Sequence, residues 1–203
     1  MSKFKTKYHG YNDDEVKSAL QKDIRRGLED KALYWAFELA YEGKSSFGWL
    51  RNRLKIIAYE DIGLANPDLV KYVSQAVNDM DFYYQNDNKE WEMALAYIIL
   101  LLCRSPKSRL VDHYKVTMKK IWELKKRWKE TDEIPDYALD YHTSGGNKLG
   151  RHKYDKNGVE HFINEGEKLV NEVKLEDSEF WKKQAHKFWR SKYDKIIEKT
   201  KKS

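Results

Sequence analysis

The sequence is poor in the residues that interrupt regular structure. Its 203 residues include only three prolines and ten glycines, whereas 40% are hydrophobic and 35% are charged. So few interruptions argue against the closely spaced turns of a β-sandwich or barrel and favour long helices. We therefore expect an all-α fold, in one domain with an appendage or in two small domains, that is long enough to bury a hydrophobic core.

Cysteine and long apolar runs are also scarce. The single cysteine, Cys103, lies in the apolar run AYIILLLC, so the chain forms no internal disulfide and the thiol is expected to be buried and inert. The longest apolar run, residues 93–103, is too short to span a bilayer, and MSKFKTKYHG has no apolar signal core. We expect a soluble cytoplasmic protein without a membrane partner, with association with the nucleoid as a further expectation.

Positive charge is concentrated in two segments. Residues 104–129 carry ten Lys/Arg against Asp112 and Glu123, a net of +8, and residues 181–203 carry nine against Asp194 and Glu198, a net of +7. Because the whole chain has a formal net charge of +6, the remainder is acidic, at −9. Clustered lysine and arginine release counterions from phosphates, so these segments predict a nucleic-acid-binding face. A solvated, lysine-rich helix face is the structural alternative.

Apolar periodicity predicts six helices in residues 13–130, after a flexible arm at residues 1–12 that is either disordered or loosely docked. The first helix ends at Arg26 with Gly27 as its C-cap, and Gly43 ends the second. The third helix covers about residues 46–60, and the fourth begins at Pro67 after an Asn66 cap. The fifth helix contains the apolar run 93–103. The sixth extends from about Pro106 to Lys129, with Ser105 as its N-cap.

The character of the chain changes after Glu130. Pro135 and four glycines break every period in residues 131–158, which we expect to form a Gly-rich basic loop. A helical extension follows in residues 159–203, with one short helix at Phe162–Val173 and a longer one from Ser178 to about Lys199.

No motif predicts catalysis, a metal site or a cofactor. Gly43-Lys44-Ser45 resembles part of a phosphate-binding loop, but that motif needs a glycine five residues earlier, where the chain has Glu38. Asp140, His142, Ser144, His152 and His161 gather in and beside the Gly-rich loop without the spacing of a triad or of metal ligands. A nuclease or hydrolase site there remains the enzymatic alternative.

A helical junction is the most informative part of the chain. YEDIGLANPD, residues 59–68, ends one apolar helix and begins another. We expect its carboxylates to bind backbone amides or nearby arginines. The predicted structural junction comprises Glu60, Asp61, Gly63 and Pro67, together with Pro106, Lys107 and Ser108.

Around this junction, SALQKDIRRG (18–27), ALYWAFELAYEG (32–43) and RSPKS (104–108) lie in an order and at spacings that resemble one family. It is the C-terminal helical, oligomerisation region of the RarA/MgsA replication-associated recombination ATPases of the AAA+ class and their eukaryotic relatives. The resemblance covers about residues 13–129, with a looser extension to about 166. It implies a helical bundle like a clamp-loader collar, here expected to be free-standing without the ATPase domain.

The resemblance implies a homo-oligomer, a tetramer in the family, that acts as a non-catalytic accessory protein of DNA replication, recombination and repair at single-strand/duplex junctions. The alternative is a protein-interaction module that binds a full-length AAA+ ATPase or a clamp-loader subunit without touching DNA. Lys148, Arg151 and Lys153 look like part of a Gly/basic/aromatic loop in the family. The candidate DNA-binding residues are Lys119, Lys120, Lys125, Lys126, Arg127, Lys148, Arg151, Lys153, Lys182, Lys183 and Arg190. Trp122, Trp128, Trp181 and Trp189 are the aromatic side chains to test for base stacking.

Overall fold

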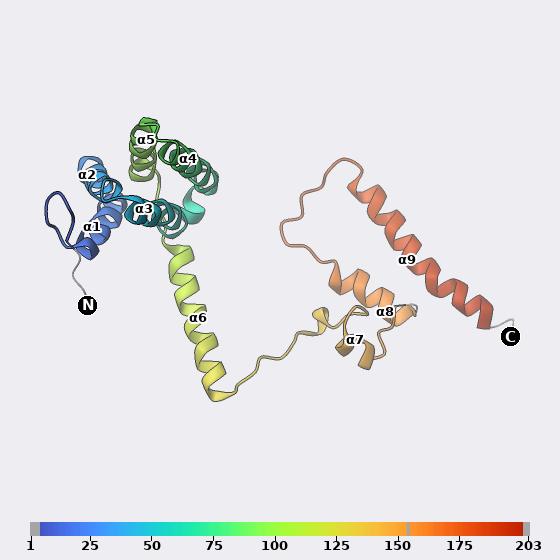
Figure 1. The fold of residues 1–203 in the computed structure, drawn as a ribbon. Coiled ribbons are helices and arrows are strands. Elements are labelled where there is room, and N and C mark those ends of the chain that lie inside the picture. Colours follow the sequence, from blue (N-terminus) through green and yellow to red (C-terminus); the bar gives the residue numbers. More distant parts are fainter. Residues whose placement is uncertain (1–4, 154, 201–203) are drawn as a thin grey trace. The chain divides into compact units, whose positions relative to one another are not determined.

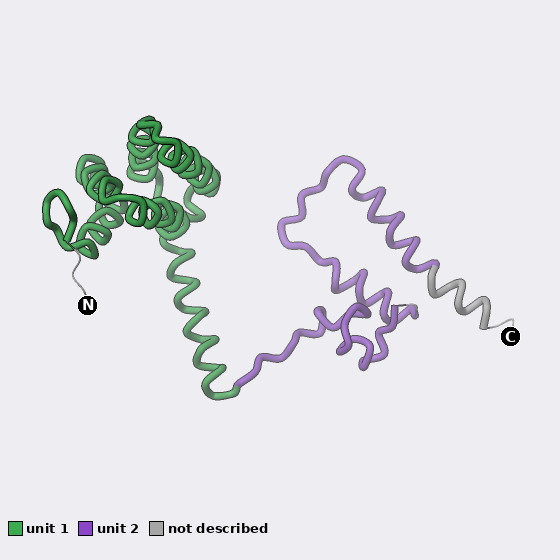
Figure 2. Tube along the Cα trace, viewed as in Figure 1, with its two compact units in different colours: residues 1–129 green, residues 130–203 purple. Residues whose placement is uncertain are grey.

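The computed structural model describes residues 5–153 and 155–200, with side chains through Ser191. In this part of the chain all regular elements are helices or helical turns (Figure 1). The predicted all-α class is therefore confirmed. The chain divides into two compact units, residues 1–129 and 130–203 (Figure 2).

Unit 1 holds six α-helices among its described residues: α1 (Asp13–Arg26), α2 (Glu29–Ala40), α3 (Lys44–Ile57), α4 (Pro67–Gln85), α5 (Glu90–Arg104) and α6 (Leu110–Trp128). A π-helical turn (Ala58–Ile62) and a 3-10 turn (Gly63–Ala65) connect α3 to α4. α1 packs against α2 and α4 against α5, while α2 also contacts α3 and α5. The first five helices thus form a bundle.

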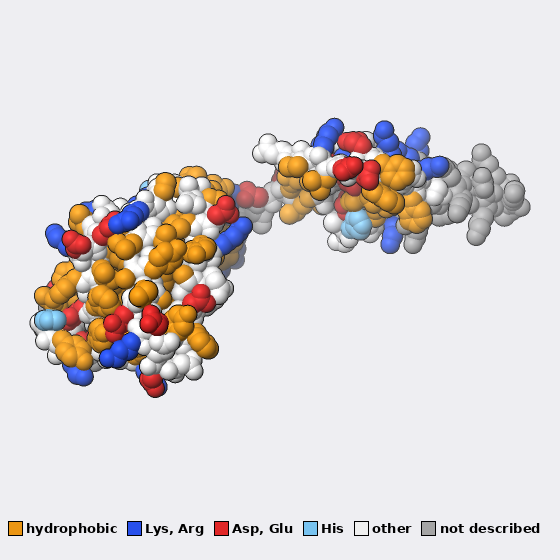
Figure 3. Space-filling view, turned by 90° about the horizontal axis from the view of Figure 1, so that it is seen from above, with side chains coloured by type: hydrophobic (Ala, Val, Ile, Leu, Met, Phe, Trp, Pro, Cys, Tyr) orange, Lys and Arg blue, Asp and Glu red, His pale blue; other side chains and the backbone are white. Residues whose placement is uncertain are grey.

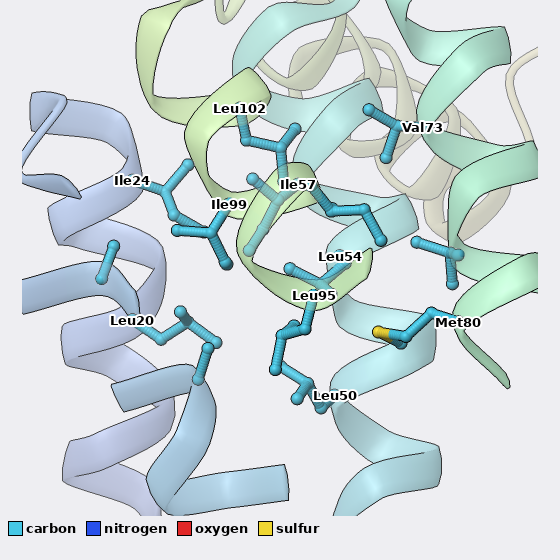
Figure 4. Packing of buried hydrophobic residues seen from close by; sticks show 14 of the residues in the cluster. Leu20, Ile24, Leu50, Leu54, Ile57, Val73, Met80, Leu95, Ile99 and Leu102 are labelled. Carbon is cyan, nitrogen blue, oxygen red and sulfur yellow. The ribbon is translucent and has the colours of Figure 1, made fainter. Parts of the chain in front are cut away.

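The core of unit 1 lies between these five helices. Figure 4 shows its central aliphatic side chains, which include Leu20 and Ile24 from α1, Leu50, Leu54 and Ile57 from α3, Val73 and Met80 from α4, and Leu95, Ile99 and Leu102 from α5. All ten are inaccessible to solvent. Because each such side chain contributes about 1.5–3 kcal/mol when buried, the bundle is a stable platform for the elements that project from it.

Unit 2 contains shorter elements: a 3-10 turn (Asp136–Ala138), α7 (Ser144–Lys148), α8 (Lys156–His161), a π-helical turn (Phe162–Gly166) and α9 (Ser178–Thr200). The sequence predicts a helix at Phe162–Val173, and this prediction is wrong. Asp155 accepts a hydrogen bond from the Gly158 amide at 2.7 Å, which starts α8 earlier. The helical hydrogen bonding ends where the Glu167 amide donates to the Phe162 carbonyl at 3.1 Å.

Two predicted boundaries in unit 1 also differ from the structure. Gly43 does not end α2, which finishes at Ala40 with Tyr41 as C-cap; Gly43 is instead the N-cap of α3. α6 begins at Leu110 and not at Pro106. Gly27 and Asn66 do cap their helices as predicted, Asn66 by accepting from the Leu69 amide at 3.2 Å.

Residues 5–12, which the sequence predicted to belong to a disordered or loosely docked arm, form a turn held against the end of α2. The Thr6 amide donates to the Tyr11 carbonyl at 2.8 Å, which closes the turn. The Lys7 amide donates to Glu42 at 2.5 Å, and His9 Nδ1 lies 2.6 Å from Glu38 Oε2. Residues 1–4 of the predicted arm lie outside the described residues.

The surface of unit 1 is mixed on the face shown in Figure 3, where lysine, arginine, aspartate and glutamate are interspersed among hydrophobic side chains. That face therefore has no single-sign patch of the kind expected to attract a polyanion. Of the helices in the described residues, none combines the length and apolarity needed to cross a membrane.

Candidate nucleic-acid and assembly site on helix α6

The segment between α5 and α6 is extended because its polar groups make contacts outside a helix. The Ser108 amide donates to the Asp61 carbonyl at 2.9 Å, and Ser108 Oγ accepts from the Leu110 amide at 3.2 Å. Lys107 Nζ donates to the carbonyls of Cys103 and Ser105 at 2.6 and 3.0 Å, and burial lowers the pKa of this lysine. These bonds explain why α6 starts at Leu110, four residues after the predicted start at Pro106.

A network of charges fixes the base of α6. The Asp61 carboxylate is fully buried, and Arg25 Nε donates to its Oδ1 at 2.7 Å, while Gln21 donates to its Oδ2 at 3.2 Å. Glu60 lies 3.4 Å from Arg53 and 3.5 Å from Arg109. The carboxylates of one junction thus meet arginines from three other parts of unit 1.

The turn at Gly63 allows the junction and α6 to approach closely. Gly63 has a φ of 48°, which favours glycine. A Cβ atom there would also lie 3.2 Å from Val111 Cγ2 and 3.7 Å from the Ser108 carbonyl oxygen. Pro67 then opens α4 at its first residue, where its missing amide costs no hydrogen bond.

α6 has no buried residue along its whole length. At 100° per residue, most of its exposed apolar side chains fall on one side, which we call the apolar stripe: Leu110, Val111, Tyr114, Met118, Ile121, Trp122, Leu124 and Trp128. Each of them is at least 38% exposed. An exposed apolar face of this extent typically marks an interaction surface.

The opposite side of α6 is basic. The same geometry places Lys115, Lys119, Lys120, Lys126 and Arg127 on this polar side. Lys119 Nζ is 3.7 Å from Glu123, and Lys126 Nζ lies 5.2 Å from the centre of the Trp122 ring. Lys125, the remaining predicted DNA-binding residue of α6, falls within the apolar stripe and is half-buried. Four of the five predicted residues of α6 therefore share one face.

The candidate residues in the Gly-rich loop belong to unit 2, and Arg151 points inward. It donates to the Leu139 carbonyl at 2.8 Å and to Asp136 Oδ1 at 2.6 Å. This arginine, followed by His161, lowers the pKa of Asp136. Lys148 and Lys153 are exposed. The guanidinium of Arg151 thus holds the loop together, whereas the two lysines face solvent.

The candidate residues in α9 likewise include an arginine that is hydrogen-bonded within unit 2 and an exposed lysine. Arg190 donates two hydrogen bonds to the Glu160 carboxylate, at 2.8 and 2.9 Å. Lys182 lies 3.6 Å from Glu172, and Lys183 is exposed. Arg190 therefore joins α8 to α9 within unit 2.

The histidines of unit 2 pair individually with acceptors. His142 Nδ1 lies 3.3 Å from Asp140, and His161 Nε2 lies 3.2 Å from Asp136. His152 Nδ1 is 3.2 Å from the Asn147 side-chain oxygen. Among the described residues, no group of three or more metal-ligating side chains converges.

Two features of this site were not anticipated from the sequence. One is the identity of the junction arginines: the sequence predicted arginines at the junction but not which ones, because Arg25, Arg53 and Arg109 are far apart in the chain and only the fold brings them together. The apolar stripe is the other. Its spacing of three and four residues is visible between the lysines of residues 110–128 and could have been found by plotting the helix.

Comparison with known proteins identifies similar chains. The family described as "MgsA AAA+ ATPase C terminal" matches residues 28–201. The replication-associated recombination protein A of Bacillus subtilis is 31% identical over 157 residues, which cover 72% of this chain and 34% of that protein. The proteins of the same name from Haemophilus influenzae and Escherichia coli K12 are each 30% identical over 125 residues, or 62% of this chain and 25% of theirs. The chain thus spans about a third or less of the length of these relatives.

Proposed function

The chain belongs to the family of MgsA AAA+ ATPase C-terminal regions, and from this premise we propose that it is an oligomerising, non-catalytic accessory factor of DNA replication and recombination. Its relatives carry the name replication-associated recombination protein A. The matched residues are a helical region, and the tetramer that the resemblance implies is the assembly we propose.

One observation carries this proposal: α6 has no buried residue and is divided into an apolar and a basic side. Burying the apolar stripe between copies would leave the lysines of the opposite side outside the interface. Self-association and DNA binding can then use the same helix at the same time. A solvated lysine-rich helix would not need eight exposed apolar side chains on its other side.

The basic side is suited to a nucleic-acid backbone. Residues 104–129 carry ten Lys/Arg and two acidic residues, and each phosphate contact by such a cation releases counterions. Lys119, Lys120, Lys126 and Arg127 are the contacts we propose on α6. Trp122 and Trp128 belong to the apolar stripe, so in this assembly they pack between copies and do not stack on bases. Lys148, Lys153 and Lys183 are further candidates in unit 2.

Light scattering of the purified chain across salt concentrations, with and without a forked oligonucleotide that has single-stranded arms, tests the proposal. We expect an oligomer that persists at high salt, since apolar burial is insensitive to screening, and DNA uptake at low salt alone. A monomer whose mass does not change with DNA would contradict it.

The apolar stripe also suits a second candidate, assembly with a full-length AAA+ ATPase or a clamp-loader subunit without DNA contact. Co-purification with such an ATPase at a salt concentration that abolishes DNA binding would favour it. A salt-dependent DNA shift by the chain alone would favour the first proposal.

A further inference from the structure

A pocket of about 530 Å³ lies between the turn at residues 5–12 and helix α2, away from α6. It is lined by Tyr8, His9, Tyr34, Phe37, Glu38 and Tyr41. Five of these six side chains carry aromatic rings and the sixth carries a carboxylate. None of the six belongs to the proposed DNA contacts or to the apolar stripe.

Glu38 is almost completely buried, with 5% of its surface exposed. Its Oε2 lies 2.6 Å from His9 Nδ1, but its Oε1 has no hydrogen-bond partner and no contact with solvent. A buried carboxylate oxygen without a donor is unfavourable. The residues around Glu38 therefore leave one strong acceptor for a donor from outside the described chain.

The tyrosine rings of the pocket are held in place by their hydroxyls. Tyr34 Oη lies 3.2 Å from Tyr11 Oη, and Tyr41 Oη donates to Glu92 at 2.6 Å. These hydrogen bonds raise the pKa of Tyr34 and of Tyr41 to about 12 each. The rings thus remain neutral phenols with fixed orientation, and their electron-rich faces are available to a cation.

We propose that this pocket binds the ammonium group of a lysine side chain presented by a partner protein. Aromatic faces around a buried carboxylate favour a cation and repel phosphate. A lysine ammonium is a compact charge on a flexible stem, so it can enter between the rings and approach the Glu38 carboxylate.

The exposure of the pocket walls favours a protein-borne lysine. Tyr8, Tyr34 and Tyr41 are 56%, 42% and 46% exposed, so the pocket opens at the surface of unit 1, where a side chain from a neighbouring protein can enter. Access to Oε1 requires the exposed His9 ring to turn aside, and exposed side chains change rotamer within nanoseconds.

The site does not depend on the proposed function in DNA metabolism. Tyr8 and His9 precede residues 28–201, the part of the chain that matches the family. A failure of lysine binding would leave DNA uptake and oligomerisation unaffected, and the reverse also holds.

The test is an NMR titration of the aromatic ring signals of the full chain with N-acetyl-lysine-N′-methylamide. We expect saturable shifts of the Tyr34 and Tyr41 signals, and no shifts with the same compound acetylated at Nζ, which has lost the charge. Glu38→Gln should weaken binding roughly tenfold or more, because it removes the negative charge while keeping the shape. Asp30→Asn, which removes one negative charge from the exposed first turn of α2 outside this pocket, should leave binding unchanged.

Tyr34→Leu is a second variant in case Glu38→Gln alters folding. Tyr34 is exposed enough to be replaced without loss of the core, and removal of its ring should also weaken binding. Equal binding by Glu38→Gln or by the Nζ-acetylated compound would overturn the proposal. Two further results would overturn it. One is binding of 1,4-diaminobutane but not of the capped lysine; the other is a shift of the Tyr34 and Tyr41 NMR signals by a single-stranded oligonucleotide but not by the lysine compound.

Discussion

Arg109, the residue before α6, reaches back to Asp61: its Nε lies 3.6 Å from Oδ1 of that fully buried carboxylate. The same guanidinium lies 3.5 Å from Glu60. α6 has no buried side chain of its own, so its attachment to the bundle depends on this base. The network therefore determines the direction in which the basic and apolar sides of α6 are presented.

Asp61→Ala should destabilise unit 1 by about 2–3 kcal/mol, since Arg25 and Gln21 would lose a common buried acceptor and Arg109 would lose an ion-pair partner. Urea unfolding followed by circular dichroism measures the change. Asp68→Ala is the control, because that side chain is 92% exposed and pairs with Lys71 at 3.7 Å, and it should have no measurable effect. Equal stability of both variants would mean that the network contributes nothing to the fold.

The helices of the bundle could be predicted because their signals are local. Asn66 and Pro67 start α4 with side-chain and ring chemistry that needs no partner from elsewhere in the chain. The start of α6 could not be predicted in this way. Ser108 and Lys107 form hydrogen bonds with Asp61 and Cys103, and such tertiary contacts override the helix-start signal of Ser105 and Pro106.

The same distinction applies to the candidate site. Of the five residues predicted on α6 from the clustering of positive charge, four lie on its basic side and Lys125 lies within the apolar stripe. Arg151 looked equally suited to phosphate from the sequence, but the fold gives it the Leu139 carbonyl and Asp136 as partners. Whether a cation is exposed or satisfied within the fold depends on contacts that spacing alone does not reveal.

Charge reversal at Lys119, Lys120, Lys126 and Arg127 to glutamate should weaken DNA binding and flatten its salt dependence, by about 0.7–0.9 in slope for each phosphate that the protein no longer neutralises. Fluorescence anisotropy with a labelled fork at several salt concentrations measures both quantities. The matched control reverses Lys22, Lys31, Lys71 and Lys89, which are exposed on the body of unit 1 and produce the same net charge. If both quadruple variants lose DNA to the same degree, α6 is not the binding face.

Met118→Asp with Ile121→Asp should shift the oligomer towards monomers, because two charges would have to be buried with the apolar stripe. Both residues are at least 40% exposed in the single chain, so its fold should be unaffected. Val116→Asp is the control within the same helix: Val116 is 55% exposed but lies on the opposite side. Sedimentation velocity gives the masses, and loss of assembly in the Val116 variant alone would refute the assignment of the interface.

The acid stability of unit 2 should depend on Asp136. Arg151 and then His161 lower its pKa in the folded chain, so its contribution is present above the ordinary aspartate pKa and is lost as pH falls through the lowered value. In Asp136→Asn the stability of unit 2 should therefore no longer fall in this acidic range, whereas in Glu133→Gln it should fall as in the unchanged chain. An acid titration followed by the NMR signals of residues 136–161 measures the effect. If Asp136→Asn loses stability at acidic pH as the unchanged chain does, other carboxylates control the acid stability of unit 2.

Gly146→Ala should disrupt the loop region of unit 2 and leave unit 1 folded. A Cβ atom at Gly146 would lie 1.9 Å from the Asp140 carbonyl oxygen, a backbone atom that cannot yield as a side chain does. Gly48→Ala is the control, because nothing lies within 4 Å of the added atom in the interior of α3, where alanine favours the helix by about 0.5–1 kcal/mol. Amide NMR spectra of both variants decide the matter: we expect the signals of residues 136–161 to collapse in Gly146→Ala while those of α1–α5 keep their positions. Loss of both sets together would mean that the two units fold as one, and retention of both would mean that the loop relaxes around the methyl group.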